Sequence, residues 1–352
     1  MKIKIAWWIA VLMFGAATSS LVLVQAASTH FAQLTQSGCC VQPFFSQDSA
    51  RVFFLDRPTS STSSTSSTSS ALAGIYGVRV DRPLEKPELI TEKLGPFSRD
   101  MIYSAKLENG RTIVERSAGL GREAARWVIG NGGRSVSFSP NGARILWSVG
   151  ESSGGFDRRK SDVWVANVDG SGARKVITRY GGGALAWLPD GERVLLGGRV
   201  QRGDALSMLS VLNLRDGMVR NLLEVGRLRA ASLSPDGHRL IYYVAQARET
   251  GQGGTFLVDL NAAVPTAVRL DFFGAYRWRD ATRLLYVPLA PGAPSNELWQ
   301  YDAASGRSVQ IIAVSADSPF RIAGGDWDVS PDGRRIVFLS ARDRALWLAE
   351  LP

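Results

Sequence analysis

SLSPDGHRLIYYV, residues 232–244, has close counterparts in AWLPDGERVLLGG (186–198) and DVSPDGRRIVFLS (328–340). In each copy, Pro presets the backbone of a turn, Asp can accept hydrogen bonds from the main chain of that turn, and Gly closes it. The residues that follow are mostly β-branched, aromatic or aliphatic, as a buried strand requires. Each phrase therefore predicts a β-hairpin.

The hairpin recurs along the chain. If the Asp or Asn of the turn is taken as a marker, with some decay allowed, it is found at Asp48, Asp100, Asn141, Asp190, Asp236, Asp280 and Asp332, of which Asp100 is the weakest match. Successive markers lie 41 to 52 residues apart, a period typical of four-stranded blades or solenoid turns. Two more strands follow each hairpin, as in DVWVANVDG (162–170) and ARKVITR (173–179).

The last repeat lacks a fourth strand. After RRIVFLS (334–340) it has only ALWLAELP (345–352), whereas FAQLTQ (31–36) resembles the fourth strand of other repeats. If this N-terminal strand completes the last unit, it closes a ring and protects the sheet edges. We therefore predict an all-β fold: a single β-propeller over residues 28–352 with seven four-stranded blades, six or eight remaining as alternatives.

SPDGRRIVF (330–338), together with strands such as DVWVANVDG (162–170), resembles the repeat of TolB-type β-propellers. These occur in bacterial envelope proteins and in the propeller domains of prolyl-oligopeptidase-like enzymes. The resemblance covers nearly all of the chain after residue 27, and it implies the fold and a location in the envelope. We expect neither the separate α/β domain of TolB nor a hydrolase domain, so TolB's partners and a peptidase activity are not carried over.

The N-terminal residues predict export. Lys2 and Lys4 precede an apolar run from Ile5 to Val24, and small residues follow around Ala26, a pattern typical of a secretory signal. The run is also long enough to span a bilayer. Residues 1–27 are therefore interpreted as a signal peptide or a membrane anchor, and the protein as extracytoplasmic, in the periplasm or at the cell surface.

Two local features stand apart from the repeat. TSSTSSTSSTSS (59–70) has almost nothing to bury, which predicts a disordered insertion within the first blade. Cys39 and Cys40 are adjacent and are the only cysteines. Because neighbouring Cα atoms lie closer together than is usual in a disulfide, a bridge would be strained; we expect unbridged thiols, with a redox-labile disulfide as the alternative.

No motif predicts catalysis. GESSG (150–154) matches the G-x-S-x-G nucleophile elbow, but that elbow requires a following helix, and here glycine and charged residues follow Ser152. The only histidines, His30 and His238, belong to the predicted closing strand and to a turn at the opposite rim. NVDGS (167–171) is a fragment of a calcium loop without the distal glutamate. We expect no catalytic residue, no metal ligand and no cofactor, and leave a structural or channel Ca²⁺ open.

Strand alternation predicts two different rims. The tight turns between first and second strands lie at one rim, whereas the long loops lie at the other, with the connections between units. Because loops on a rigid scaffold commonly carry binding, we expect a basic and aromatic binding face there. Its candidate residues are Arg158, Arg159, Lys160, Arg179, Tyr180, Arg227, Tyr276, Arg277, Phe320 and Arg321.

The formal net charge is +9, which favours anionic partners through screened attraction, although an Arg-rich solvated surface is the simpler explanation. We predict an exported, non-catalytic binding or scaffold propeller that recognises a protein or an acidic envelope polymer, with membrane association through residues 5–24. Nucleic acid is not expected, because no basic run is interleaved with aromatic residues. The alternative is a carbohydrate- or lactone-active enzyme with a carboxylate or divalent-ion site at the central channel.

Overall fold

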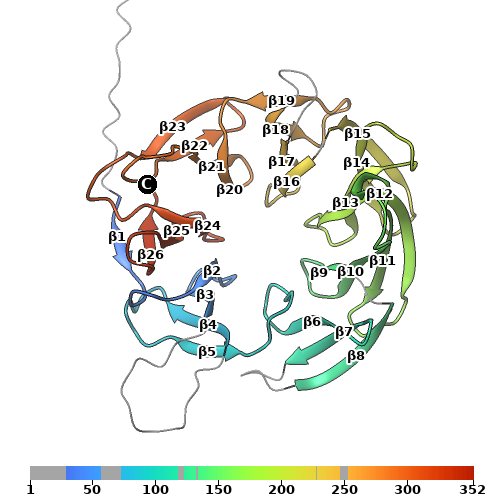
Figure 1. The fold of residues 1–352 in the computed structure, drawn as a ribbon, viewed down its shortest axis with the longest axis horizontal. Helices are drawn as coiled ribbons and strands as arrows, with labels where there is room; N and C mark the ends of the chain where they lie inside the picture. The colour runs from blue at the N-terminus through green and yellow to red at the C-terminus, as the bar shows by residue number, and fades with distance from the viewer. Residues whose placement is uncertain (1–28, 57–72, 118–122, 132–133, 227, 246–252) are drawn as a thin grey trace, which may run out of the picture.

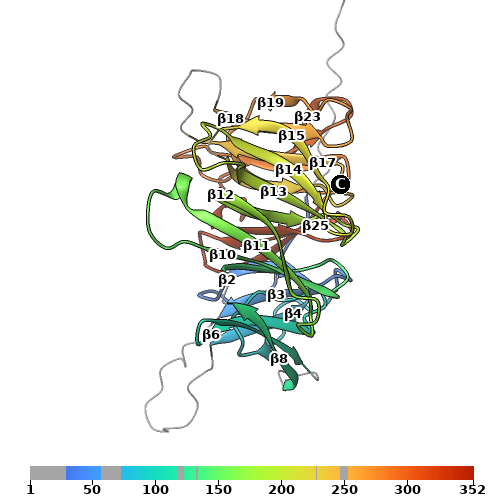
Figure 2. The ribbon, with the colours of Figure 1, turned by 90° about the vertical axis from the view of Figure 1, so that its right-hand side faces the viewer.

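The computed structural model describes residues 29–352, except 57–72, 118–122, 132–133, 227 and 246–252. The described residues form strands β1 to β26 and one short 3-10 helix, η1 (Phe156–Arg158), with no α-helix among them. Figure 1 shows the sheets arranged radially around a central opening, with strands such as β2, β16, β20 and β24 innermost. Figure 2 shows the same ring from the side.

All sheets of the described residues are antiparallel; four of the six hold four strands, and in three of these the strands follow chain order. We number the repeat units by their hairpins. Unit 1 contains β2 (Val41–Phe45), β3 (Arg51–Asp56), β4 (Gly74–Arg79) and β5 (Glu88–Thr91). Unit 5 contains β16 (Leu228–Leu233), β17 (Arg239–Val244), β18 (Gly254–Asp259) and β19 (Ala267–Leu270). Unit 6 contains β20 (Gly274–Trp278), β21 (Arg283–Pro288), β22 (Leu298–Asp302) and β23 (Arg307–Ile312).

Unit 2 is a three-stranded sheet of β6 (Tyr103–Glu108), β7 (Arg111–Ser117) and β8 (Glu123–Asn131). Its innermost position is taken by a single bridge from Phe97 to Ser104. Units 3 and 4 share one seven-stranded sheet, β9 (Arg134–Phe138), β10 (Arg144–Gly150), β11 (Lys160–Asn167), β12 (Arg174–Trp187), β13 (Arg193–Arg199), β14 (Ser207–Asn213) and β15 (Val219–Val225).

The 14-residue strand β12 is both the outer strand of unit 3 and the inner strand of unit 4. Its pairing shifts register between Tyr180 and Gly183, where the chain turns from one role to the other. By hydrogen bonding the described strands therefore form six sheets. The predicted number of seven blades corresponds to dividing the shared sheet at β12, and it stays a prediction.

Unit 7 is closed by the N-terminal strand, as predicted. β24 (Ile322–Val329), β25 (Arg335–Ser340) and β26 (Leu346–Glu350) are completed by β1 (Phe31–Gln33), which pairs with β26 in antiparallel register. Beyond the strand, Leu34 N donates to Leu346 O at 2.8 Å, and Leu346 N donates to Thr35 Oγ1 at 2.9 Å.

The core lies between units. Leu34, Phe45 and Phe54 pack with Val337 and Leu348 to join unit 1 to unit 7. Similar clusters join units 2 to 3, 3 to 4, 4 to 5, 5 to 6 and 6 to 7. Because a sheet in this ring buries its apolar faces on its neighbours, the units depend on one another for a core.

Five of the seven hairpin turns share one set of hydrogen bonds, formed by a serine and the Asp or Asn two residues later. Ser234 Oγ donates to Asp236 and accepts from Arg239 N at 2.9 Å. Equivalent bonds form around Ser46, Ser98, Ser139 and Ser330. The set at Ser98 includes Asp100, so the weakest marker of the sequence is a true member of the repeat.

Three sequence expectations need comment. The structure joins Cys39 to Cys40 in a disulfide, so the expectation of unbridged thiols was wrong; Cys40 takes a positive φ of 71°, and the two adjacent side chains meet. The signal or anchor over 1–27 and the Thr/Ser insertion at 59–70 lie outside the described residues. No helix of the described part of the chain is long and apolar enough to cross a membrane.

The closing strand generates the first prediction. Deletion of Thr29 to Gln36 should lower Tm sharply, because it exposes the edge of β26 and removes Leu34 from the core. A finer variant, Thr35→Val, leaves the buried N–H of Leu346 without its acceptor, at a cost of about 1–3 kcal/mol. Thr35→Ser keeps the hydroxyl and is the control. Thermal unfolding measures all three, and an unchanged Tm in the deletion would contradict ring closure.

The hairpin turns generate the second prediction, which concerns backbone strain. Gly142 and Gly237 take φ of 68° and 72°, and in unit 2 Met101 takes the same place with φ of 60°. This left-handed conformation favours glycine. Met101→Gly should raise the free energy of unfolding by roughly 0.5–1 kcal/mol, because relief of the left-handed backbone outweighs the entropic cost of glycine, whereas Gly142→Ala should lower it. Denaturant titration checks both, and a destabilised Met101→Gly would show that side-chain packing outweighs backbone strain.

Candidate functional site

A cavity of about 1130 Å³ lies at the centre of the ring, at the rim of the hairpin turns. Every repeat unit contributes to its wall, through residues within the segments 44–47, 97–101, 140, 186–189, 231–235, 278–279 and 328–331. The wall combines aromatic and aliphatic residues with polar ones, including serines and arginines, and such convergent polar groups in a concave site are typical of small-molecule sites. The side chains of Phe97, Trp187 and Trp278 are among those that line it.

Asp328, on β24, is the one carboxylate among the residues that line this cavity. Its Oδ2 accepts a hydrogen bond from Phe45 N at 3.2 Å. Burial raises the pKa of Asp328 above its ordinary value, and the main-chain N–H groups of Phe45 and Val329 together with the charge of Arg277 oppose this only in part. A carboxyl group with a raised pKa inside a cavity is a candidate for proton transfer.

Arg279 also lines the cavity, but its guanidinium has a structural role. It is buried and donates to Gly333 O at 2.9 Å, Gln300 Oε1 at 2.6 Å and Pro352 O at 2.7 Å. It thereby ties unit 6 to the hairpin turn of unit 7 and to the end of the described chain.

No metal centre emerges from the described residues, since no three His, Cys, Asp or Glu side chains lie close enough together to hold an ion. The expectation of no cofactor stays a prediction. Ser152 is exposed in the loop before η1, and the helix that follows has only three residues, so the geometry of a nucleophile elbow is not formed. His238 pairs with Asp236 at 3.2 Å in a hairpin turn.

At the other rim, the long loop 151–160 is held in place. Glu151 exchanges hydrogen bonds with Lys160, through Lys160 N to Glu151 Oε2 and Glu151 N to Lys160 O, both at 3.0 Å. Arg202 of unit 4 forms an ion pair with Glu151 at 3.0 Å and lies over the ring of Tyr180. Gly181 N donates to Arg159 O at 2.9 Å. The loop that presents Arg158 is therefore anchored on both units.

The predicted binding residues fall into three groups. Arg158, Arg277 and Arg321 are exposed, and Arg277 lies 5.5 Å from the centre of the Trp327 ring. Partly buried members are engaged locally: Arg159 donates to Gly154 O, Lys160 pairs with Asp162 at 3.1 Å, and Tyr180 lies under Arg202. The remaining three described members are buried, namely Arg179, Tyr276 and Phe320.

The buried members do not present their side chains at the rim. Phe320 packs edge-to-face on Phe338 in the core between units 6 and 7, and the Tyr276 hydroxyl donates to Ala230 O. Burial lowers the pKa of Arg179, whose guanidinium donates to Thr178 O. Arg227 lies outside the described residues. Of the described residues that were predicted to form one basic and aromatic face, only the arginines Arg158, Arg277 and Arg321 are therefore exposed to solvent rather than partly or fully buried.

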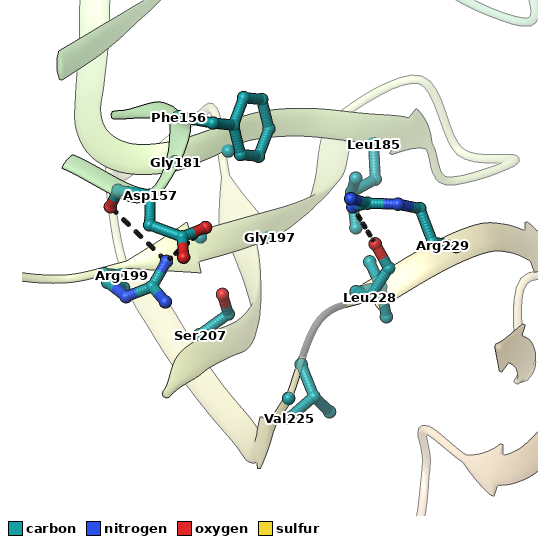
Figure 3. A pocket seen from close by; sticks show the side chains of 13 residues that line it. Phe156, Asp157, Gly181, Leu185, Gly197, Arg199, Ser207, Val225, Leu228 and Arg229 are labelled. Atoms are coloured by element: carbon teal, nitrogen blue, oxygen red, sulfur yellow. Dashed lines mark hydrogen bonds and ion pairs between the residues drawn. The ribbon is translucent and has the colours of Figure 1, made fainter. Parts of the chain in front are cut away.

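Sequence reasoning missed Arg199 and the glycines beside it. Arg199 Nη1 lies 3.4 Å from Asp157 Oδ1, and its Nε donates to Asp204 O at 2.7 Å. Figure 3 shows this pair at one side of a small cavity and Arg229 at the other, with Phe156 above. The glycine runs 181–183 and 197–198 were the sequence signal for a close approach of main chains.

No protein-family model and no curated protein sequence matches the chain. Among solved structures it is similar to oligogalacturonate lyase from Vibrio parahaemolyticus, over 93% of this chain and 98% of that one, with a TM-score of 0.60 and 12% identity. An oligogalacturonate lyase in complex with manganese matches over 92% and 96%, with a TM-score of 0.59 and 13% identity. TolB from Acinetobacter baumannii matches over 76% of this chain and 64% of TolB, with a TM-score of 0.43 and 13% identity.

At these identities the likeness concerns the fold. Radial antiparallel sheets, a shared central cavity and closure by an N-terminal strand define the class of protein: the chain is a β-propeller. Its repeats resemble those of TolB-type propellers, as the hairpin phrase implied.

Asp328 generates the third prediction. Its raised pKa means that its ionised form destabilises the fold, so Asp328→Asn should raise Tm at pH 7. The gain should shrink as the pH falls through the raised pKa and vanish near the unfolded value of about 3.9, because the carboxyl is then neutral in both states. Thermal scans from pH 4 to 8 test this. A gain independent of pH would contradict the electrostatic explanation.

Proposed function

We propose that this chain is an exported binding propeller whose loop-rich rim recognises an acidic partner. The observation that carries the proposal is a set of guanidinium groups with no carboxylate partner. Within the described part of the chain, ion pairs engage Arg199 and Arg202 at this rim, but none engages Arg158, Arg229 or Arg321, all of which are exposed.

Exposed, unpaired cations favour an anionic partner in two ways. They attract it over a distance, which raises the association rate, and they lose little when it arrives because no internal ion pair must first break. Arg158 in addition lies on an anchored loop, so less conformational entropy is lost on binding.

An extracytoplasmic location is part of the same proposal. It rests on the apolar run and small residues within 1–27, which are typical of export signals. In that location, a net charge of +9 would attract the anionic polymers and lipid headgroups of a cell envelope. If the N-terminal segment is cleaved, the protein binds its partner as a free molecule; if the segment is retained, the protein does so while anchored to a membrane.

The fourth prediction concerns this rim. A variant with Arg158 and Arg321 changed to Ala should bind immobilised polyglutamate or polygalacturonate at least about ten-fold more weakly at low salt. A matched variant removes the same charge elsewhere, at the exposed Arg215 and Arg307 of the hairpin-side turns. Binding should weaken with salt as the screening length falls to about 8 Å. Equal losses in the two variants would reduce the effect to net charge and contradict a specific rim.

The second candidate is a carbohydrate-active enzyme acting in the central cavity. The observation that favours it is Asp328, a carboxyl with raised pKa in a cavity lined by aromatic side chains; the likeness to oligogalacturonate lyases supports the fold only. Incubation with oligogalacturonates in the presence of Mn²⁺, followed by ultraviolet absorbance of unsaturated products, tests it. Turnover that is lost in Asp328→Asn but retained in the rim variant would favour the enzyme over the binder.

A further inference from the structure

A cavity of about 130 Å³ lies between units 4 and 5 at the loop-rich rim. Figure 3 shows its surroundings: η1 with Phe156 above, Arg199 at one side, Arg229 and Leu185 at the other, and Val225 below. It is separate from the central cavity, with which it shares no lining residue.

Glycine main chains form one wall of this cavity. A Cβ on Gly182 would lie 2.3 Å from Gly197 O, and one on Gly198 would lie 3.0 Å from the Cα of Gly182. β12 and β13 can approach so closely only because these positions lack side chains. The rest of the lining is mainly apolar, from Leu185, Val225 and Leu228.

The size and lining of the cavity suit one large apolar side chain. An apolar cavity of about 150 Å³ is known to accept benzene, so about 130 Å³ fits the end of a Leu or Phe side chain. Phe156 leaves 57% of its surface exposed beside the opening, which extends the apolar contact. An acidic polysaccharide has no group of this kind, whereas a protein segment does.

The arginines at the opening of the cavity determine which residues of a partner are favoured beside that apolar side chain. Arg199 is already engaged by Asp157 and by Asp204 O. Arg229 donates only to the carbonyl of Leu228, its own neighbour in sequence, at 2.9 Å, and forms no ion pair with any described residue. A carboxylate next to the apolar side chain of a partner could accept a charge-assisted hydrogen bond from the guanidinium of Arg229.

We propose that this cavity anchors a Phe or Leu side chain of an acidic protein segment, with a flanking Asp or Glu on Arg229. This rests on the proposed function and narrows its partner from any acidic polymer to a protein. Two contacts of different chemistry at one place would give the rim sequence selectivity, which unpaired arginines alone do not provide.

The fifth prediction tests this with two synthetic peptides, acetyl-Glu-Asp-Phe-Asp-Glu-amide and the same peptide with Ser in place of Phe. Calorimetry on the full chain should show at least about ten-fold tighter binding of the Phe peptide. Ser207→Leu, which fills the cavity from β14, should abolish that difference, and Arg229→Ala should weaken the Phe peptide about ten-fold. Ser207→Ala and Arg334→Ala are the matched controls, and Tm verifies that each variant is folded.

Equal binding of the two peptides, or a Phe preference that survives Ser207→Leu, would overturn the anchor. Absence of peptide binding, with polygalacturonate still bound through the rim arginines, would overturn the anchor and leave the proposed function standing. If the unmodified protein binds neither polygalacturonate nor polyglutamate, the proposed function itself is contradicted. Self-association that disappears in Arg229→Ala would identify a second copy as the occupant and likewise contradict the proposal.

Discussion

The pairing of β1 with β26 is the constraint on which the ring depends. Without it, the last unit would present an open edge of unpaired N–H and C=O groups, and the cluster that holds unit 7 to unit 1 would lose Leu34. Thr35 reinforces the junction, because its hydroxyl supplies the buried acceptor for Leu346 N. Residues more than 300 positions apart in sequence thus complete one sheet. As a result the ring is closed, and each unit lies between two neighbours.

The seams of the ring are not equivalent. Apolar clusters of buried residues join every pair of successive units except units 1 and 2 in the described part of the chain. At that seam, Glu115 is buried between Lys93 and Lys106, at 2.8 and 2.7 Å, and these lysines hold the pKa of Glu115 below its ordinary value despite its burial. A paired buried charge contributes less to stability than apolar packing, so this seam is the weaker one.

The two rims differ because their connections differ. At the hairpin rim, the Asp or Asn of each turn, joined by a serine in five of the seven units, satisfies the main chain of the turn internally, which leaves short connections around a central cavity containing Asp328. At the opposite rim, longer loops cross between units, and the loop bearing Arg158 is anchored by Arg202 of unit 4. One end of the ring is therefore suited to enclosing a small molecule, and the other to contacting a larger surface.

The hairpins, their period and the closing strand could be predicted from the sequence because they depend on local chemistry: turn residues with defined backbone preferences, followed by apolar strands. Even Asp100, in a decayed copy, makes the hydrogen bonds of the repeat. The candidate site could be predicted only as a rim. Whether an arginine or aromatic residue on that rim is exposed depends on the adjacent unit, which leaves Arg158 in solvent but buries Arg179 and Phe320. The cavity beside Arg229 likewise has a wall that forms only because Gly182 and Gly198, on different strands, allow two main chains to meet, a contact that tertiary structure alone decides.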